Sequence, residues 1–446
     1  MSAHHSTKAY VVAVDMGYGH ERAAYALRHL AANGEIVIAN NYKGIPKLDQ
    51  LLWNQSRRFY ELVSRLQPVP VVGKAIFKAL ADNNQRIAPF YPRRDLSEPS
   101  TQLKQVMYGL EKRGLLRDLI ERLRAKPLPL VCTFFLPAFA AELHDYPGEI
   151  YVVVCDADIA RVWAPRDPKH SRIKYFAPNG RVVERLKLYG VREENIFLTG
   201  FPMPKELVGG EKAEIIKTDL LARICNLDPK RIFWSRYSKT LRAALGGSCL
   251  LTRTHPLTLT FSVGGAGAQK RIAVEALRAV RTLVRRGKMR VVLVAGTKKA
   301  AANYFQESVR EMGLNGELGR GVHILYTKTR REYFPAFTKL LRETDILWTK
   351  PSELSFYTGL GIPIIMAPPI GSQEDFNRIW IFNVGGGTDQ LDPSHMEEWL
   401  MDWVNSGALA RMAWNGFIEA PTHGAFRIEQ IITGRPYKLE TLPLIV

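Results

Sequence analysis

Short apolar runs alternate with helix-like patterns along most of this chain. The runs AYVVAV, EIYVVVCD, TLTFSV and RVVLVAG are almost continuously apolar, which is typical of parallel strands that are covered on both faces. Segments such as AQKRIAVEALRAVRTLVRRG lie between these runs, and their apolar residues recur every three or four positions, as in amphipathic helices. The alternation predicts an α/β fold with two Rossmann-like, doubly wound parallel-sheet domains in tandem.

Two segments interrupt the alternation and set the expected domain boundaries. Residues 41–130 read as helical and aromatic-rich, with 17 Lys or Arg against 8 Asp or Glu. We interpret them as a basic helical insertion in an N-terminal domain of residues 1–204. Residues 205–257 hold a second basic helical stretch and are expected to form a linker or insertion. The C-terminal domain is then expected over residues 258–446.

The net charge of the 446-residue chain is +19 at pH 7, which predicts attraction to phosphate-rich partners. No motif that reads nucleic acid accompanies this charge, so no nucleic-acid partner is expected. An anionic membrane surface and a phosphorylated substrate remain as candidate partners. The charge does not indicate an oligomeric state.

Several absences from the sequence narrow the location and the chemistry. No apolar run approaches the roughly 20 residues that span a bilayer, and the start MSAHHSTK lacks the pattern of a secretory signal. The four cysteines show no CxxC spacing, so we expect a reducing compartment and no cysteine-bound zinc. The ten histidines form no HxxxH or HExxH pattern, and no metal site is expected. A cytoplasmic location is predicted, with peripheral attachment to the inner face of the membrane as its extension.

The first predicted strand is followed by the sequence DMGYGHERAAYAL. Gly17 and Gly19 permit left-handed backbone angles and the close approach of another molecule. Tyr18 lies between these glycines, and His20 stands at the start of the next predicted helix. A strand, a glycine turn and a helix N-terminus together predict a ligand site.

The sequence FSVGGAGAQK repeats this arrangement in the second half of the chain. Unpaired amides at a helix N-terminus favour anions, so Gly264, Gly265, Ala266 and Gly267 are candidate phosphate-binding residues. A purely structural turn is an equal alternative. The chain has no GxxxxGK[ST] and no full GxGxxG followed by an acidic strand end, which argues against a P-loop and against dinucleotide binding.

Polar residues follow several later strands of the sequence. In LWTKPSEL, Ser352 is expected to cap a helix, and Glu353 is expected to lie exposed at the carboxyl end of the sheet, where ligands of such folds bind. Glu353 then holds ribose hydroxyls or only complements the helix dipole. In VVVCDADIARVW, Asp156 and Asp158 end a strand, as ligand-binding or as capping carboxylates.

The order and spacing of these motifs resemble the two-domain glycosyltransferases of the GT-B type. The chain is most similar to the monogalactosyldiacylglycerol synthases and, more distantly, to the N-acetylglucosaminyl transferase of lipid II synthesis. The resemblance is carried by DMGYGH, VCDADIARVW, KYFAPNGRVVERLKLYGVREENIFLTGFPMP, SVGGAGAQ, TKPSELSFYTGLGIPII and GSQEDFN. The chain departs from the pattern at Tyr18, in a slightly shorter TKPSEL loop, and in residues 205–255, which have no counterpart.

The resemblance implies two Rossmann-like domains that face a cleft. It implies transfer of a sugar from a nucleoside diphosphate donor, a UDP-sugar in the first instance, to a hydroxyl acceptor for which a lipid is a candidate. No cofactor or metal is implied besides the nucleotide sugar as co-substrate. His20 is the implied general base, and histidine is a residue type whose usual pKa suits this role at neutral pH. The other implied site residues are Gly17, Tyr18, Gly19, Asp156 and Trp163 on the acceptor side; Gly264, Gly265, Ala266 and Gly267 at the diphosphate; Thr297, Thr349, Lys350, Ser352 and Glu353 at the nucleoside; and Gln373, Glu374 and Asn377 at the donor sugar.

Two other functions remain open from the sequence. A sugar-nucleotide epimerase of the same fold would use carboxylates around the sugar, for which Asp156 and Asp158 are candidates. A non-catalytic, basic membrane-binding protein would use residues 41–130. The aromatic residues of that segment are Trp53, Phe59, Tyr60, Phe77, Phe90, Tyr91 and Tyr108, and its candidate apolar stripe is Leu51, Leu52, Phe59, Leu62, Val63 and Leu66.

Overall fold

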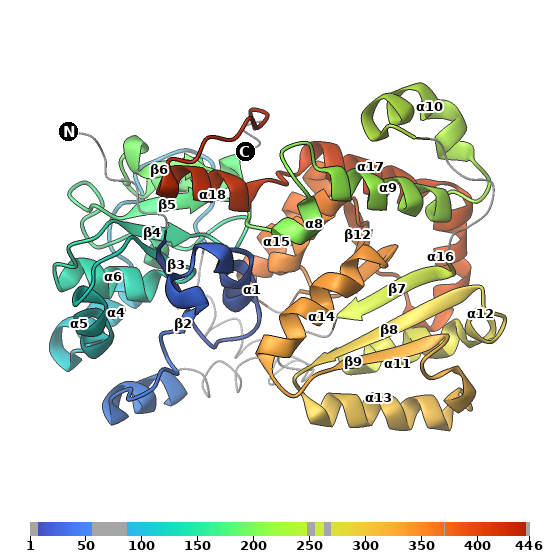
Figure 1. The fold of residues 1–446 in the computed structure, drawn as a ribbon, viewed down its shortest axis with the longest axis horizontal. Coiled ribbons are helices and arrows are strands. Elements are labelled where there is room, and N and C mark those ends of the chain that lie inside the picture. The colour runs from blue at the N-terminus through green and yellow to red at the C-terminus, as the bar shows by residue number, and fades with distance from the viewer. Residues whose placement is uncertain (1–7, 56–86, 248–254, 263–268, 370, 443–446) are drawn as a thin grey trace. The chain divides into compact units, whose positions relative to one another are not determined.

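The computed structural model describes residues 8–55, 87–247, 255–262, 269–369 and 371–442. The chain forms two compact units (Figure 1). Unit 1 consists of Met1–Pro204, Ile370–Asn377 and His423–Val446, and unit 2 consists of Lys205–Pro369 and Arg378–Thr422.

Unit 1 is built on a parallel sheet that has six strands among the described residues. The strands are β1 (Tyr10–Ala13), β2 (Val37–Ile38), β3 (Leu130–Cys132), β4 (Ile150–Val153), β5 (Lys174–Ala177) and β6 (Ile196–Leu198). Their order across the sheet is β2-β1-β3-β4-β5-β6. The chain therefore reverses its direction across the sheet between β1 and β3, and the carboxyl ends of strands at such a switch point are where open α/β sheets bind ligands.

Both faces of this sheet are buried, as the apolar runs predict. Successive residues of a strand point to opposite faces, so Val11 packs with α1 and α18 while Val12 packs with the helices of the other face. The helices of unit 1 include α1 (Gly19–Ala26), α4 (Thr101–Arg113), α5 (Arg117–Arg124), α6 (Phe135–Leu143), α7 (Gly180–Leu188) and α18 (Gly424–Thr433). Ala425, Ile428 and Ile432 of α18 complete the core on the first face. Residues 423–446 therefore belong to unit 1, which differs from the predicted boundary.

Unit 2 has a second parallel sheet, again of six strands within the described ranges. The strands are β7 (Leu257–Ser262), β8 (Met289–Gly296), β9 (Val322–Tyr326), β10 (Ile346–Thr349), β11 (Ile364–Met366) and β12 (Gly387–Asp389). Their order is β12-β11-β10-β7-β8-β9, which is the Rossmann order with its switch point between β7 and β10. The prediction of two Rossmann-like parallel-sheet domains is confirmed.

Helices surround the sheet of unit 2 (Figure 1). They are α8 (Lys205–Val208), α9 (Glu214–Leu227), α10 (Ile232–Leu245), α11 (Lys270–Ala279), α12 (Arg281–Arg285), α13 (Lys299–Glu311), α14 (Arg330–Arg342), α16 (Met396–Asn405) and α17 (Ala408–Glu419). Helix α15 (Ser372–Val384) belongs to unit 1 as far as Asn377. Leu259, Phe261 and Trp348 of the strands share one core with α9, α10, α11, α13, α16 and α17.

The described part of residues 205–257 (205–247 and 255–257) is an integral part of unit 2 and not a separate linker. Ile224 of α9 and Trp234 of α10 lie in its core. The fully buried guanidinium of Arg223 donates hydrogen bonds to the backbone oxygens of Thr344 (2.7 Å) and Leu360 (3.0 Å). In the sequence, the many basic residues on the outer side of this segment made its apolar inner side difficult to recognise.

The described residues contain no helix that is both long enough and apolar enough to cross a membrane. Cys132 and Cys155 are buried free thiols, as expected from their apolar strands. Cys225 is disulfide-bonded, which the cysteine spacing did not predict. Because disulfides are rare in reducing compartments, the cysteines no longer support the inference of such a compartment.

Candidate functional site

His20 lies at the switch point of unit 1, in the first turn of α1. The preceding turn depends on Gly17, whose φ of +119° is one that other residues rarely adopt. The side chain of Tyr18 is buried (8% exposed), and its backbone oxygen accepts the amide of Arg22 at 2.8 Å. This turn fixes the start of α1 and directs His20 towards the end of β3.

A hydrogen bond joins the imidazole of His20 to the neighbouring strand. Its Nδ1 atom lies 2.6 Å from the backbone oxygen of Thr133, directly after β3. A carbonyl oxygen only accepts, so Nδ1 carries the proton and Nε2 is the basic nitrogen of the neutral ring. The thiol of Cys155 also points to the oxygen of Thr133, at 3.6 Å.

Aromatic side chains surround this imidazole. The ring of Phe134 meets it edge-on with centroids 5.0 Å apart, and the ring of Trp163 lies at 6.3 Å. Trp163 is 8% exposed and packs in turn on Phe135, at 5.2 Å. His20 itself stays partly exposed. The sequence motifs did not single out Thr133 or Phe134, although their place after a strand at the switch point is the signal that finds them.

Asp156 and Asn377, predicted for different parts of the substrate, lie together in unit 1. Asn377 Nδ2 donates to Asp156 Oδ1 at 3.0 Å, and the amide of Ala157 donates to Asn377 Oδ1 at 2.7 Å. Asn377 is fully buried. The contacts show that Asn377 orients the loop after β4 and holds the Asp156 carboxylate in place.

Asp158 is a structural carboxylate. Its two oxygens accept from Arg185 Nε (2.8 Å) and Nη2 (2.9 Å), and Arg181 Nε adds a third bond at 3.0 Å. Asp158 and Arg185 are almost completely buried. Burial lowers the pKa of Arg185, but the hydrogen-bonded carboxylate of Asp158 more than offsets this effect, so the pKa lies above its ordinary value. Asp156 and Asp158 therefore do not form a carboxylate pair that faces a substrate.

In unit 2 four of the predicted nucleoside residues, Thr349, Lys350, Ser352 and Glu353, lie at the carboxyl end of β10, at the switch point of the sheet. Thr349 is buried and donates from Oγ1 to the backbone oxygen of Ser262 at 3.3 Å. The next helix is a 3₁₀ helix, Glu353–Leu360, and the side chain of Ser352 does not cap it. The backbone oxygen of Ser352 instead accepts the amide of Ser355 at 2.9 Å. Glu353, expected to be exposed, is 9% exposed. The predicted Ser352 cap and the exposure of Glu353 are therefore wrong.

The remaining predicted donor residues are distributed as follows. Gly264, Gly265, Ala266 and Gly267 lie outside the described residues. Just beyond them, Gln269 Nε2 donates to the backbone oxygen of Pro368 at 2.9 Å, a link that no motif indicated. Thr297 and Lys350 are partly exposed after β8 and β10, and Gln373 and Glu374 lie in the first turn of α15. The described residues hold no cluster of side chains that fits a metal ion.

Comparison with known families and structures gives limited matches. Residues 251–424 match a family described as a domain of unknown function, DUF6938. A comparison with curated proteins finds no match.

Solved structures with a similar chain course have low identity. MurG of Acinetobacter baumannii is 10% identical with a TM-score of 0.47, over 96% of this chain and 100% of that chain. A glycosyltransferase of Rickettsia africae is 11% identical with a TM-score of 0.41, over 96% and 99%. UDP-GlcNAc 2-epimerase of Neisseria meningitidis, bound to UDP-GlcNAc, is 12% identical with a TM-score of 0.42, over 78% and 84%. Since these scores carry no functional argument, the function has to be argued from the residues of the two units.

Proposed function

We propose that this protein is a glycosyltransferase that moves a sugar from a nucleoside diphosphate donor, a UDP-sugar in the first instance, to a hydroxyl group of an acceptor. The observation that carries the proposal is the hydrogen bond between His20 Nδ1 and the oxygen of Thr133. It presents Nε2 of a partly exposed histidine as the basic nitrogen, at the sheet position where such folds bind ligands.

In the proposed reaction, His20 Nε2 takes the proton of the acceptor hydroxyl, and the oxygen of that hydroxyl attacks the anomeric carbon of the donor sugar. The bond between that carbon and the diphosphate oxygen breaks, and the diphosphate leaves with the bonding electrons. A general base in this position contributes about 10²–10⁴-fold to the rate. The thermodynamic drive comes from the donor, and no metal or other cofactor is part of the proposal.

Donor binding is assigned to the carboxyl ends of β7, β8 and β10. Thr349 ends β10, Lys350 and Glu353 follow it, and Thr297 follows β8, at the sheet edge where a nucleoside binds in open α/β folds. Residues 264–267 are proposed to bind the diphosphate through backbone amides. Gln373 and Glu374 are proposed for the sugar hydroxyls.

For the acceptor we propose a lipid, presented at the inner face of an anionic membrane. Not all aromatic residues of the segment 41–130 are available to a membrane, since Trp53 and Phe90 are buried. Tyr91 and Tyr108 are exposed (65% and 56%) and are available to a membrane interface. Phe59, Tyr60, Leu62, Val63, Leu66 and Phe77 lie outside the described residues.

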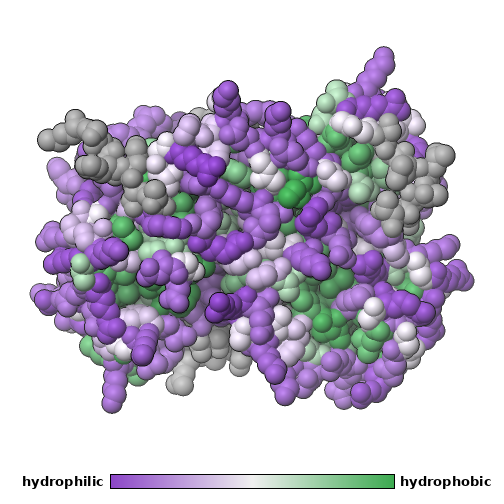
Figure 2. Space-filling model, in the orientation of Figure 1, coloured by the Kyte–Doolittle hydropathy of each residue, from purple (hydrophilic) through white to green (hydrophobic). Residues whose placement is uncertain are grey.

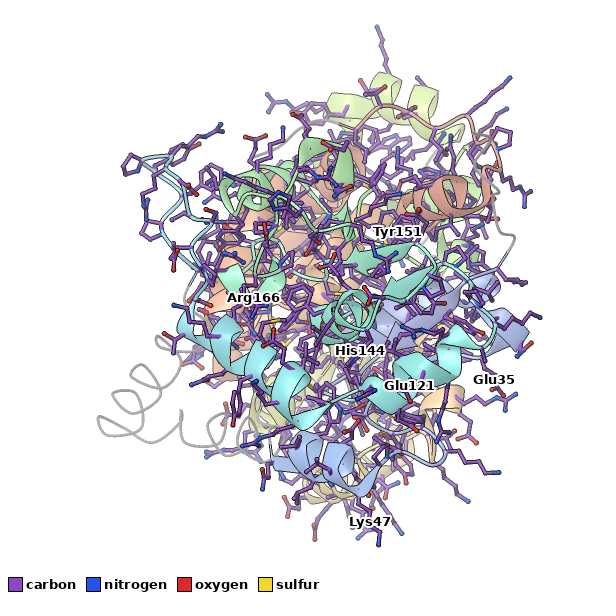
Figure 3. The ribbon with its side chains drawn as sticks, turned by 90° about the vertical axis from the view of Figure 1, so that its left-hand side faces the viewer. Glu35, Lys47, Glu121, His144, Tyr151 and Arg166 are labelled. Carbon is purple, nitrogen blue, oxygen red and sulfur yellow. The ribbon has the colours of Figure 1, made fainter. Side chains whose placement is uncertain are left out.

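Some of the charges on the helices of this segment form ion pairs. Arg117 pairs with Glu121 at 2.9 Å on α5, and Arg166 reaches Glu111 of α4 at 2.8 Å. Figure 3 looks onto this side of unit 1, where Lys47, Glu121 and Arg166 are labelled among side chains of both signs. Because residues 41–130 hold 17 Lys or Arg against 8 Asp or Glu, these pairs leave an excess of positive charge, which is complementary to an anionic surface.

Incubation with a panel of nucleotide sugars and hydroxyl acceptors tests the proposal. A transferase releases nucleoside diphosphate only when both donor and acceptor are present. An epimerase instead converts the donor to a second nucleotide sugar without an acceptor, and the ion-paired state of Asp158 argues against that outcome. Absence of both reactions across the panel, with no nucleotide binding by calorimetry, would overturn the proposal.

A further inference from the structure

The outward side of α10 in unit 2 combines basic and apolar residues. The inward side of this helix is fixed in the core of the unit through Phe233, Trp234, Leu241 and Leu245. The backbone of α10 kinks at Tyr237. Ile232 and Arg236 are spaced four apart before the kink, and Lys239 and Ala243 are spaced four apart after it, so each pair lies on one side of its part of the helix. All four are exposed.

Apolar side chains protrude from this basic side. Ile232 is 51% exposed and Tyr237 is 40% exposed, and the guanidinium of Arg236 lies 5.6 Å from the ring centre of Tyr237. In Figure 2 the region over α10, at the upper right, shows hydrophobic and strongly hydrophilic side chains next to one another. Tyr237 also packs on the core residue Phe233, with ring centroids 5.0 Å apart, so Ile232 is the protruding side chain for which the core offers no use.

The charge of α10 is uncompensated. Residues 229–247 contain five Lys or Arg and no Asp or Glu. Lys230, Arg236, Lys239 and Arg242 form no ion pair with a carboxylate anywhere in the described ranges. This differs from α5, where Arg117 has its own glutamate. A positive surface without internal partners is complementary to an anionic surface of another molecule.

We propose that the outer side of α10 binds an anionic membrane surface. Ile232 and Tyr237 enter the headgroup region, while Arg236, Lys239 and Arg242 contact lipid phosphates. An aliphatic side chain such as Ile232 gains from a lipid interface and gains little from a nucleic-acid backbone, which favours the membrane. This surface is separate from the segment of residues 41–130, and its binding does not depend on the proposed transferase activity.

Vesicle co-sedimentation of the full chain tests the proposal, with phosphatidylcholine vesicles and with vesicles of equal parts phosphatidylcholine and phosphatidylglycerol. The variant Arg236→Gln, Lys239→Gln, Arg242→Gln is expected to lose about 100-fold in its partition onto the anionic vesicles. The variant Ile232→Ser, Tyr237→Ser is expected to lose about tenfold, and this loss should persist at high salt, which screens the charges.

A matched control removes the same charge elsewhere on unit 2. Arg310, Arg331 and Lys339 are exposed on α13 and α14, and their replacement by Gln should leave the partition almost unchanged. Equal losses in the two triple variants, or no loss in either, would overturn the proposal. The proposal is also overturned if the α10 variant loses binding to a DNA duplex while it keeps its binding to vesicles. Thermal unfolding of each variant identifies losses that come from misfolding.

Discussion

The Nδ1 atom of His20 and the backbone oxygen of Thr133 lie 2.6 Å apart, although 113 residues separate the two in the chain. This contact joins the helix after β1 to the loop after β3, across the switch point of unit 1. It selects Nε2 as the nitrogen that can accept a proton, and it gives the proposed chemistry a defined geometry.

The buried ion pair of Asp158 should matter for stability and not for chemistry. Replacing Asp158 by Asn leaves the Arg185 guanidinium, which is fully buried, without its counter-charge. Such losses cost about 3–5 kcal/mol in the free energy of unfolding, measurable by denaturant titration. Turnover per folded molecule should stay unchanged. The control Asp167→Asn removes an exposed partner of His170 and should have no measurable effect. A large loss of turnover in folded Asp158→Asn would show that Asp158 takes part in the reaction.

Glu353 should contribute to the binding of the donor nucleoside. A carboxylate that accepts ribose hydroxyls loses its charge in Glu353→Gln, and a hydrogen bond to a charged group is worth a factor of about 10–100 in affinity. Calorimetry should show that the dissociation constant for UDP is larger by this factor in the variant. Glu343→Gln, which removes an exposed partner of Arg290 at 3.0 Å, is the control. If UDP binds both variants as it binds the wild type, Glu353 only complements the helix start.

The segment of residues 205–257 should behave as part of the core of unit 2. Ile224 on α9 is fully buried, whereas Ile232 on α10 is 51% exposed. Ile224→Ala should lower the free energy of unfolding by about 2–5 kcal/mol, and Ile232→Ala should change it by less than about 0.5 kcal/mol. Similar small changes in both variants would instead describe a loosely attached linker.

A buried carboxyl predicts how the stability of unit 2 depends on pH. Burial raises the pKa of Asp345 above its ordinary value of 3.8, and neighbouring His255, Thr258, Arg223 and Asn226 oppose this rise only in part. The folded state therefore binds this proton more tightly than the unfolded state, and the contribution of Asp345 to stability falls as the pH rises from 3.8 through its raised pKa.

Asp345→Asn removes this titration. The unfolding free energy of the variant minus that of the wild type should increase over the same pH interval, as measured by urea titrations at several pH values. Groups that do not interact with Asp345 titrate equally in the two proteins, so their contribution cancels in the difference. A difference that stays flat, or that decreases with pH, would show that the carboxyl is not shifted upwards.

The sheets could be predicted from the sequence because parallel strands that are buried on both faces leave continuous apolar runs. The runs around Val11, Val152 and Phe261 are of this kind, and each lies in a strand of the structure. The turn at Gly17 and the position of His20 also followed from local sequence, since a left-handed turn demands glycine.

Partners that lie far apart in the chain could not be predicted. The apolar residues of α18 form an ordinary amphipathic pattern, which does not indicate that Ile428 covers the sheet of unit 1. Asp158 meets Arg185 across 27 residues, and nothing near Asp158 in the sequence marks it as structural. The same holds for Thr133, which is a site residue only because β3 pairs with β1 in the folded sheet.

His20 is proposed as the base of a sugar transfer, and the decisive measurement is the turnover of His20→Asn together with its affinity for the donor. Asparagine keeps a donor for the oxygen of Thr133 and has no basic nitrogen. His170→Ala, at an exposed histidine of the same unit, is the control. We expect His20→Asn to lose about 10²–10⁴-fold in turnover while its donor dissociation constant stays that of the wild type. Turnover near the wild-type rate in this variant would show that His20 is not the base.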